Sequence, residues 1–128
     1  MSSERAPILI LADDALVAAL LGALIETLGC SVQFGHQFES ANDAMRRTRP
    51  SVCVLDADYR AESSDETLGH AAMRGIAAIL FGTQKALDRN RALVEKHGVV
   101  TLRMPPSPAD LDTALQRAMR STPPSVTL

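Results

Sequence analysis

The sequence contains few aromatic residues, few cysteines and no large excess of charge of either sign. Only 3% of its 128 residues are aromatic and tryptophan is absent. The interior must therefore be aliphatic, and there are no platforms on which nucleic-acid bases could stack. Against 15 Asp and Glu residues stand 13 Lys and Arg residues, a net charge of -2. Because this balance provides no basic field for a phosphate backbone, we expect no nucleic-acid partner.

Long apolar runs and cysteine motifs are also missing. No run approaches the roughly 20 apolar residues that a membrane-spanning helix needs. Residues 1–7 are polar and too short for a secretory signal. We therefore expect a cytoplasmic protein without a membrane partner. Cys30 and Cys53 have no CxxC or metal-ligand spacing, so their context favours buried small hydrophobic side chains over a redox role.

The sequence does contain an alternation of strand and helix patterns. Its 46% hydrophobic and 22% charged residues are typical of one globular domain. Continuous apolar runs at 7–12, 51–55 and 76–81 are typical of strands buried on both faces. Two further strands are expected at 30–34 and 99–103, and helices are expected at 40–49, 63–74, 85–97, 109–119 and, first in the chain, 15–28.

This alternation predicts an α/β fold. Five strands separated by five helices favour a five-stranded parallel sheet with helices on both faces, because parallel strands need right-handed crossover connections. The architecture is a three-layer, doubly wound sandwich. We expect this domain to span residues 7–120, after a short N-terminal extension (1–6) and before a loose C-terminal tail (121–128).

Several residues mark the ends and faces of the expected helices. Serines with an acid three residues later are typical helix N-caps, and a proline at the first helical position follows the last of them. In the first helix, four leucines recur at helical spacing and mark one apolar stripe, after which Gly29 occupies a C-cap position. The caps are Ser40, Ser63 and Ser107, and the stripe is Leu16, Leu20, Leu24 and Leu28.

Carboxylates follow two of the buried strands. Asp13 and Asp14 come directly after the first, and Asp56 comes directly after the third. In a flavodoxin-like strand order 2-1-3-4-5, these strands are neighbours beside the topological switch point, where function gathers. Three such anions repel one another, and clustered oxygen ligands suit Mg²⁺. The alternative is that one acid only caps the first helix, worth about 0.3–1 kcal/mol, but a cap needs a single acid.

Four segments together resemble a known family. They are Ile10–Asp14, Leu28–Gly29, Val54–Asp56 and Met104–Leu111. In this order and spacing they resemble the receiver domain of bacterial response regulators, the CheY-like family, over residues of about 7 to 120. The resemblance places the family's acidic pair at Asp13 and Asp14, and its phosphoacceptor at Asp56. It also implies a flavodoxin-like fold.

The resemblance implies a chemistry. Asp56 would accept a phosphoryl group from a histidine kinase or phosphotransfer protein, and Mg²⁺ would bind Asp13, Asp14, Asp56 and the main-chain carbonyl of Asp58. Phosphoryl transfer depends mostly on positioning and charge neutralisation, which these groups supply. The position at which the family has its switch hydroxyl corresponds to Thr83 or to Gly82, depending on the register of the strand. The chain would be no enzyme beyond gaining and losing its own phosphoryl group.

The sequence departs from the family on the response side. Met104 stands where the family has lysine, so no ammonium pairs with the phosphoryl oxygens. Thr101 stands at the position of the switch aromatic, and residues 57–62 replace a Met-Pro turn. Tyr59, in that segment, is either a displaced aromatic lever or a partly exposed loop side chain, and its context favours the second interpretation.

Two functional hypotheses follow. The first is a single-domain receiver in two-component or phosphorelay signalling, whose output is binding to a downstream protein. The alternative is a pseudo-receiver, a phosphorylation-independent interaction or dimerisation module such as a homodimer. The leucines that could serve a partner have the helical spacing typical of core residues: Leu87, Leu93, Leu111 and Leu115. An enzyme or flavin carrier is disfavoured, because no glycine-rich phosphate loop follows the first strand.

Overall fold

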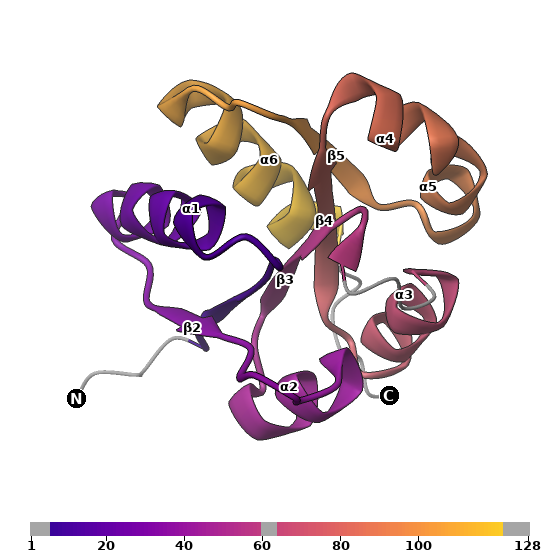
Figure 1. Ribbon diagram of the computed structural model, residues 1–128, viewed down its shortest axis with the longest axis horizontal. Coiled ribbons are helices and arrows are strands. Elements are labelled where there is room, and N and C mark those ends of the chain that lie inside the picture. The colour runs from indigo at the N-terminus through magenta and orange to yellow at the C-terminus, as the bar shows by residue number, and fades with distance from the viewer. Residues whose placement is uncertain (1–5, 60–63, 122–128) are drawn as a thin grey trace.

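Five parallel strands form the central layer of the computed structural model, which describes residues 6–59 and 64–121 (Figure 1). Their order across the sheet is β2-β1-β3-β4-β5, as predicted. The connections between neighbouring strands run through helices, because every paired strand is parallel to its neighbour. The strands are β1 (Ile8–Leu11), β2 (Val32–Phe34), β3 (Val52–Asp56), β4 (Ala77–Gly82) and β5 (Val100–Arg103).

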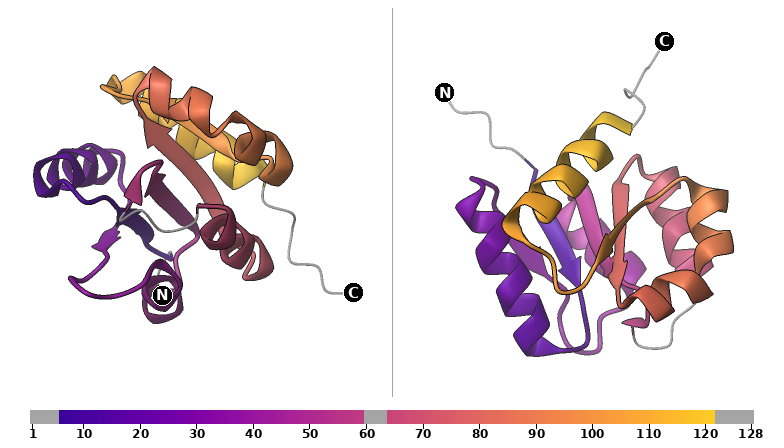
Figure 2. Two further views of the ribbon diagram at one scale, coloured as in Figure 1. Left: turned by 45° about the vertical axis from the view of Figure 1, so that its right-hand side comes forward. Right: turned by 90° about the horizontal axis from the view of Figure 1, so that it is seen from above.

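Helices cover both faces of the sheet (Figure 2). On one face lie α1 (Ala15–Thr27) and α6 (Pro108–Ser121). On the other lie α2 (Ala41–Thr48), α3 (Ser64–Met73), α4 (Gln84–Arg89) and α5 (Arg91–His97). The prediction of one helix over 85–97 is wrong. It divides at Asn90, whose side-chain amide donates to the carbonyl of Ala86 at 2.8 Å, as asparagine does when it competes with helical backbone bonds.

The core consists of two aliphatic layers, one on each side of the sheet. Along β1, Ile8 and Ile10 face the layer under α1 and α6, whereas Leu9 and Leu11 face the other. Each of these four side chains is at most 1% exposed. The four leucines predicted at core spacing also pack in these layers: Leu87, Leu111 and Leu115 are buried, and Leu93 packs against the core partly buried.

The outward face of α1 differs from the prediction. Leu16 and Leu20, in the expected apolar stripe, are 79% and 50% exposed. The buried residues of α1 are instead Leu21, Gly22 and Ile25. Residues 15–25 are apolar all round the helix, so their periodicity does not reveal which side faces the sheet.

The helix caps follow the sequence signals closely. Ser40 accepts a hydrogen bond from Asp43 N, and Ser107 and Asp110 form a reciprocal capping box in front of Pro108. Gly29 and Gly98 have φ values of 88° and 63° at helix ends, where a residue with a Cβ would be strained. The predicted cap at Ser63 lies outside the described residues. So do residues 1–5 of the expected N-terminal extension and residues 122–128 of the expected C-terminal tail. The last helix, α6, extends through Ser121.

The two cysteines are free thiols in different surroundings. Cys53 is buried in β3, and burial raises the pKa of its thiol to about 12, which makes it unreactive. Cys30 is only partly buried and precedes β2, whereas the sequence predicted it within a strand. No helix in residues 6–59 and 64–121 is long and apolar enough to span a membrane.

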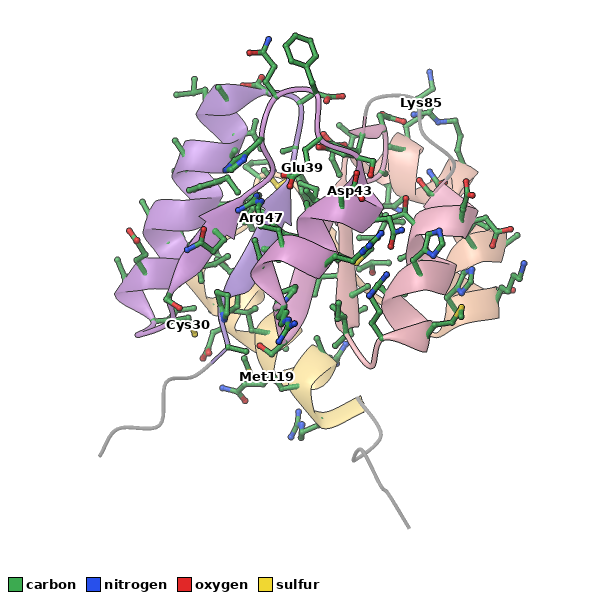
Figure 3. The ribbon with its side chains drawn as sticks, turned by 90° about the horizontal axis from the view of Figure 1, so that it is seen from below. Cys30, Glu39, Asp43, Arg47, Lys85 and Met119 are labelled. Atoms are coloured by element: carbon green, nitrogen blue, oxygen red, sulfur yellow. The ribbon has the colours of Figure 1, made fainter. Side chains whose placement is uncertain are left out.

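An ion pair between Glu39 and Arg47 stabilises the loop that joins β2 to α2 (Figure 3). Arg47 donates from Nε and Nη2 to the two carboxylate oxygens of Glu39, at 2.7 and 2.9 Å, and Nη2 also donates to the carbonyl of Phe34. Glu39 Oε1 also accepts from the backbone N–H of His36. The Arg47 guanidinium holds the pKa of Glu39 down to about 2. The loop thus has a fixed conformation, in which Phe38 has a left-handed backbone.

We predict that Glu39→Gln destabilises the fold in a pH-dependent way. The folded pKa of Glu39 lies below its ordinary value of 4.5, so its stabilisation is complete above that value and is lost as the pH falls towards about 2. Urea unfolding should show a loss of about 1 kcal/mol at pH 7 and a smaller loss at pH 3. The matched control is Asp43→Asn, whose exposed pair with Arg46 spans 3.7 Å and should change stability by only a few tenths of a kcal/mol. Equal losses for Glu39→Gln at both pH values would contradict this assignment.

Candidate functional site

Three carboxylates emerge at one edge of the sheet. The register pairs Leu11 with Leu55, so β1 and β3 end at the same level. Asp13 and Asp14 follow β1, and Asp56 is the last residue of β3. The charges of Asp13 and Asp14 act on Asp56 closely enough to raise its pKa. The predicted site residues Asp13, Asp14 and Asp56 therefore follow neighbouring strands at the same carboxyl edge, at the topological switch point.

Asp56 is the half-buried member of this group. Burial raises the pKa of its carboxyl above the ordinary range, and the charges of Asp58, Asp13 and Asp14 raise it further. The backbone N–H of Asp58 opposes this shift by donating to Asp56 Oδ1 at 2.9 Å. A desolvated carboxylate among other anions is a group whose negative charge is poorly compensated.

Asp14 has a structural task as well. Its Oδ1 accepts from the backbone N–H groups of Leu16 and Val17, at 2.9 and 3.2 Å, and so caps α1. The cap weighed from the sequence as an alternative is therefore present at Asp14. Asp13 is not needed for this cap. It is exposed and lines a groove beside α1.

An arginine that the sequence did not indicate reaches this edge. Nη2 of Arg89, in α4, lies 3.2 Å from Oδ1 of Asp58 in an ion pair that is largely exposed. The two residues are 31 positions apart. Neither periodicity nor a local motif could reveal this contact, because it depends on how α4 packs beside β4 and β5.

The oxygen donors suit Mg²⁺ in type, but they are not gathered into a ready coordination shell. Among the residues that the structure describes, no three His, Cys, Asp or Glu side chains form a group that could hold a metal ion. Oδ1 of Asp14 and Oδ1 of Asp56 already accept backbone hydrogen bonds. In the same described residues, Oδ2 of each makes no hydrogen bond. The three predicted carboxylates thus share one edge of the sheet, and their charges act on one another. They do not form a complete coordination shell for a metal ion.

The hydroxyl of Thr83 belongs to a helix cap. Its oxygen accepts from Ala86 N at 3.1 Å, and Thr83 is exposed at the start of α4. Gly82 is the last residue of β4, and a Cβ added there would lie 3.3 Å from the Cβ of Ala86 and 3.4 Å from that of Ala57. The strand end itself therefore carries no hydroxyl and has little room for one.

Met104 and Tyr59 both lie against apolar surroundings. Met104 is partly buried against the layer under α1 and α6, while its N–H donates to the carbonyl of Gly82 at 2.9 Å. Tyr59 is only 4% exposed and packs in the other layer. The prediction of a partly exposed loop tyrosine is therefore wrong. Its ring closes the space beneath the β2–α2 loop, where the absence of a side chain at Gly35 leaves room for the phenol oxygen.

No family model and no curated protein matches the sequence. The fold is similar to solved receiver structures. The response regulator receiver domain protein of Clostridium thermocellum has a TM-score of 0.73 and 24% identity, over 90% of this chain and 94% of that chain. The chemotaxis response regulator CheY4 of Vibrio cholerae has a TM-score of 0.71 and 16% identity, over 89% and 98%. The signal receiver domain of an HD domain-containing protein of Pseudomonas fluorescens has 0.76 and 16%, over 95% and 92%.

These similarities establish the fold. The structural neighbours are CheY-like receiver domains, and the predicted flavodoxin-like sheet with order 2-1-3-4-5 is confirmed. Each match spans nine tenths or more of the neighbour's chain, so the likeness covers a whole receiver domain.

We predict that Asp56→Asn stabilises the protein at neutral pH. The pKa of Asp56 is raised above its ordinary value of 3.8, so the folded state binds this proton more tightly than the unfolded chain does. Stability attributable to Asp56 therefore falls as the pH rises from 3.8 through the folded pKa, and the whole penalty is present above it. Asparagine removes that penalty and can still accept from Asp58 N. Thermal unfolding at pH 7 should shift upwards by roughly 1–4 °C.

The control for this experiment is Glu95→Gln, which removes an exposed carboxylate on α5. It should leave the unfolding temperature unchanged. The gain of Asp56→Asn should shrink as the pH approaches 3.8. A gain that is the same at every pH would show that the charge of Asp56 is not its cause.

Proposed function

We propose that this chain is a receiver module of a two-component or phosphorelay pathway, in which Asp56 accepts a phosphoryl group. The observation that carries the proposal is the half-buried carboxylate of Asp56 at the end of β3, within the field of Asp13, Asp14 and Asp58. Likeness in fold to receiver domains supports the same proposal. The phosphoryl donor is the phosphohistidine of a histidine kinase or phosphotransfer protein, and the protein acts in the cytoplasm.

In the proposed transfer, an oxygen of Asp56 forms a bond to phosphorus as the phosphorus–nitrogen bond of phosphohistidine breaks. Burial and neighbouring charge raise the pKa of Asp56, which makes its carboxylate more basic and so a better nucleophile. The N–H of Asp58 orients Oδ1 and leaves Oδ2 as the attacking atom. The chain catalyses no reaction other than the gain and loss of its own phosphoryl group.

Magnesium is the cofactor that this donor set suits. Bound there, Mg²⁺ would neutralise charge on the transferred group. The residues that would hold it are Asp13, Asp14, Asp56 and, through its main-chain carbonyl, Asp58. Because the carboxylate of Asp58 is paired with Arg89, its charge is partly compensated.

Fewer side chains are available to respond to phosphorylation than to accept the phosphoryl group. Met104 packs in an apolar layer and provides no ammonium for the phosphoryl oxygens. The hydroxyl of Thr83, whose oxygen caps α4, is the one candidate for a switch donor that the sequence indicated, and it would donate through its free hydrogen. The output would be binding to a downstream protein target, since the chain has no basic field for nucleic acid.

A pseudo-receiver is the second candidate. The observation in its favour is the pairing of Met104 with Gly82, which leaves neither an ammonium nor a hydroxyl at the ends of β4 and β5. In this alternative the acids at the carboxyl edge are retained without phosphoryl transfer, and the chain acts as an interaction or dimerisation module.

Incubation with acetyl phosphate and Mg²⁺ should add one phosphoryl group to the wild-type chain, detected by intact mass. Asp56→Asn should abolish the adduct, because the amide is not a nucleophile. Glu95→Gln, which removes an exposed carboxylate on α5 away from the carboxyl edge, is the matched control and should keep the adduct. An unmodified wild-type chain would favour the pseudo-receiver, and an adduct retained by Asp56→Asn would contradict the assignment of the acceptor.

Met104→Lys should strengthen the response. A lysine there would bring an ammonium to the phosphoryl oxygens, a charge-assisted contact that should raise the affinity for beryllofluoride with Mg²⁺ roughly 3- to 10-fold. Amide chemical shifts of β4, α4 and β5 report both binding and the accompanying change. Met104→Leu is the control for altered packing. Equal responses of the lysine and leucine variants would show that another group already serves in place of the missing cation.

A further inference from the structure

The outward side of α1 is an apolar surface without a partner in the described structure. All ribbon views place α1 at the edge of the molecule (Figures 1 and 2). We define the α1 face by its exposed residues: Ala15, Leu16, Ala19, Leu20 and Ala23. Leu16 is 79% exposed, and no residue between 15 and 25 carries a charge. Leu16 and Leu20, half of the leucine stripe that the sequence predicted, thus point to solvent, whereas Leu24 packs against the core.

Two phenylalanines continue this surface beyond the helix. Phe34, at the end of β2, is 41% exposed and lies against α1, since a Cβ on Gly22 would come within 2.8 Å of its ring. Phe38 is 92% exposed and has a φ of 70°, a left-handed conformation that is a genuine outlier for a bulky residue. The ion pair between Glu39 and Arg47 stabilises the loop that carries Phe38. Phe38 is thus presented on a fixed loop, although exposing it to water is unfavourable.

A groove lies between the helix and the loop. Its volume is about 610 Å³, large enough for an aromatic side chain. We call it the α1 groove; its walls include Ala15, Ala18, Ala19, Phe34, Gln37 and Tyr59. The small alanine side chains create the hollow, and of the lining residues that the structure describes only Asp13 is charged. Gln37 lines this groove, so the exposed ring of Phe38 next to it in the chain is carried by the loop that forms one wall.

We propose that a second copy of this chain occupies this surface, as a two-fold symmetric dimer. A symmetric interface must be self-complementary, and Phe38 of each copy can enter the α1 groove of the other. No residue of the α1 face carries a charge. The face therefore neither attracts a basic or acidic partner nor repels the α1 face of a second copy. Leu16, Leu20, Phe34 and Phe38, which are 79%, 50%, 41% and 92% exposed, would all be covered in such a dimer. A standard interface covers about 800 Å² of each partner.

The dimer does not depend on phosphoryl acceptance. Its strength comes from apolar burial, with Asp13 at the groove and the acids of the carboxyl edge nearby. Salt screens repulsion between these acids in the two copies and leaves apolar burial intact. Association should therefore become tighter, or stay the same, as salt is raised.

Sedimentation equilibrium of the full chain, from micromolar to millimolar concentration, tests the proposal. The wild-type chain should dimerise, and Leu16→Glu and Phe38→Asn should each weaken the dimer at least tenfold. Neither change should harm the fold, because an acid in the first turn suits the helix dipole and asparagine tolerates a left-handed backbone. The matched control is Met73→Glu at the end of α3, where an apolar side chain is 86% exposed on another part of the surface. It should leave the dimer unchanged.

Amide chemical shifts measured at several concentrations locate the interface. Shifts that move with concentration should fall on α1 and on residues 34–38. A monomer at all concentrations, a dimer that Met73→Glu weakens as much as Leu16→Glu, or shifts confined to α4 and β5 would each overturn the proposal. Circular dichroism of every variant at the same concentrations shows whether the fold is retained.

Discussion

The pairing of β1 with β3 is the constraint on which the rest of the structure depends. Both strands are buried on both faces, so a slip of one residue would move every side chain to the opposite aliphatic layer. Each buried aliphatic side chain contributes about 1.5–3 kcal/mol, and the two layers contain many of them. Their sum exceeds the repulsion between two like charges, which is about 1 kcal/mol in water and about 4 kcal/mol near a protein surface. Packing therefore fixes the level at which Asp13, Asp14 and Asp56 leave the sheet, and their mutual repulsion is tolerated. The raised pKa of Asp56 is a consequence of hydrophobic packing in the sheet.

The sequence predicted those features of the fold that depend on local chemistry. Continuous apolar runs correctly indicated buried parallel strands, and Ser107 with Asp110 correctly indicated the start of α6. The prediction was wrong where local patterns were ambiguous. An all-apolar α1 has no preferred side until it packs against β1 and β2, so Leu16 turned out to face solvent. The break at Asn90 follows from a side chain that competes with helical hydrogen bonds, a weak signal within an otherwise helical run.

The candidate site was predictable to a similar extent. The order of strands and acids was enough to bring Asp13, Asp14 and Asp56 to one edge. It offered a helix cap at one of the two acids but could not decide that Asp14 makes it. It could not reveal that Tyr59 is buried, or that Arg89 pairs with Asp58 from 31 residues away. These facts depend on tertiary packing. They divide the site into an anionic half at the ends of β1 and β3 and a second half where Gly82 has no side chain and Met104 packs against an apolar layer.

The cap at Asp14 also links two regions of the molecule mechanically. One oxygen of this side chain satisfies the N–H groups of both Leu16 and Val17, the first backbone donors of α1. Any ligand that rotates the carboxylate away from them leaves both donors unbonded, so the first helical turn must fray, recruit water or tilt. Leu16 sits in that turn. A ligand at the acidic rim that displaced Oδ1 of Asp14 from these donors would thus loosen the turn that carries an outward leucine.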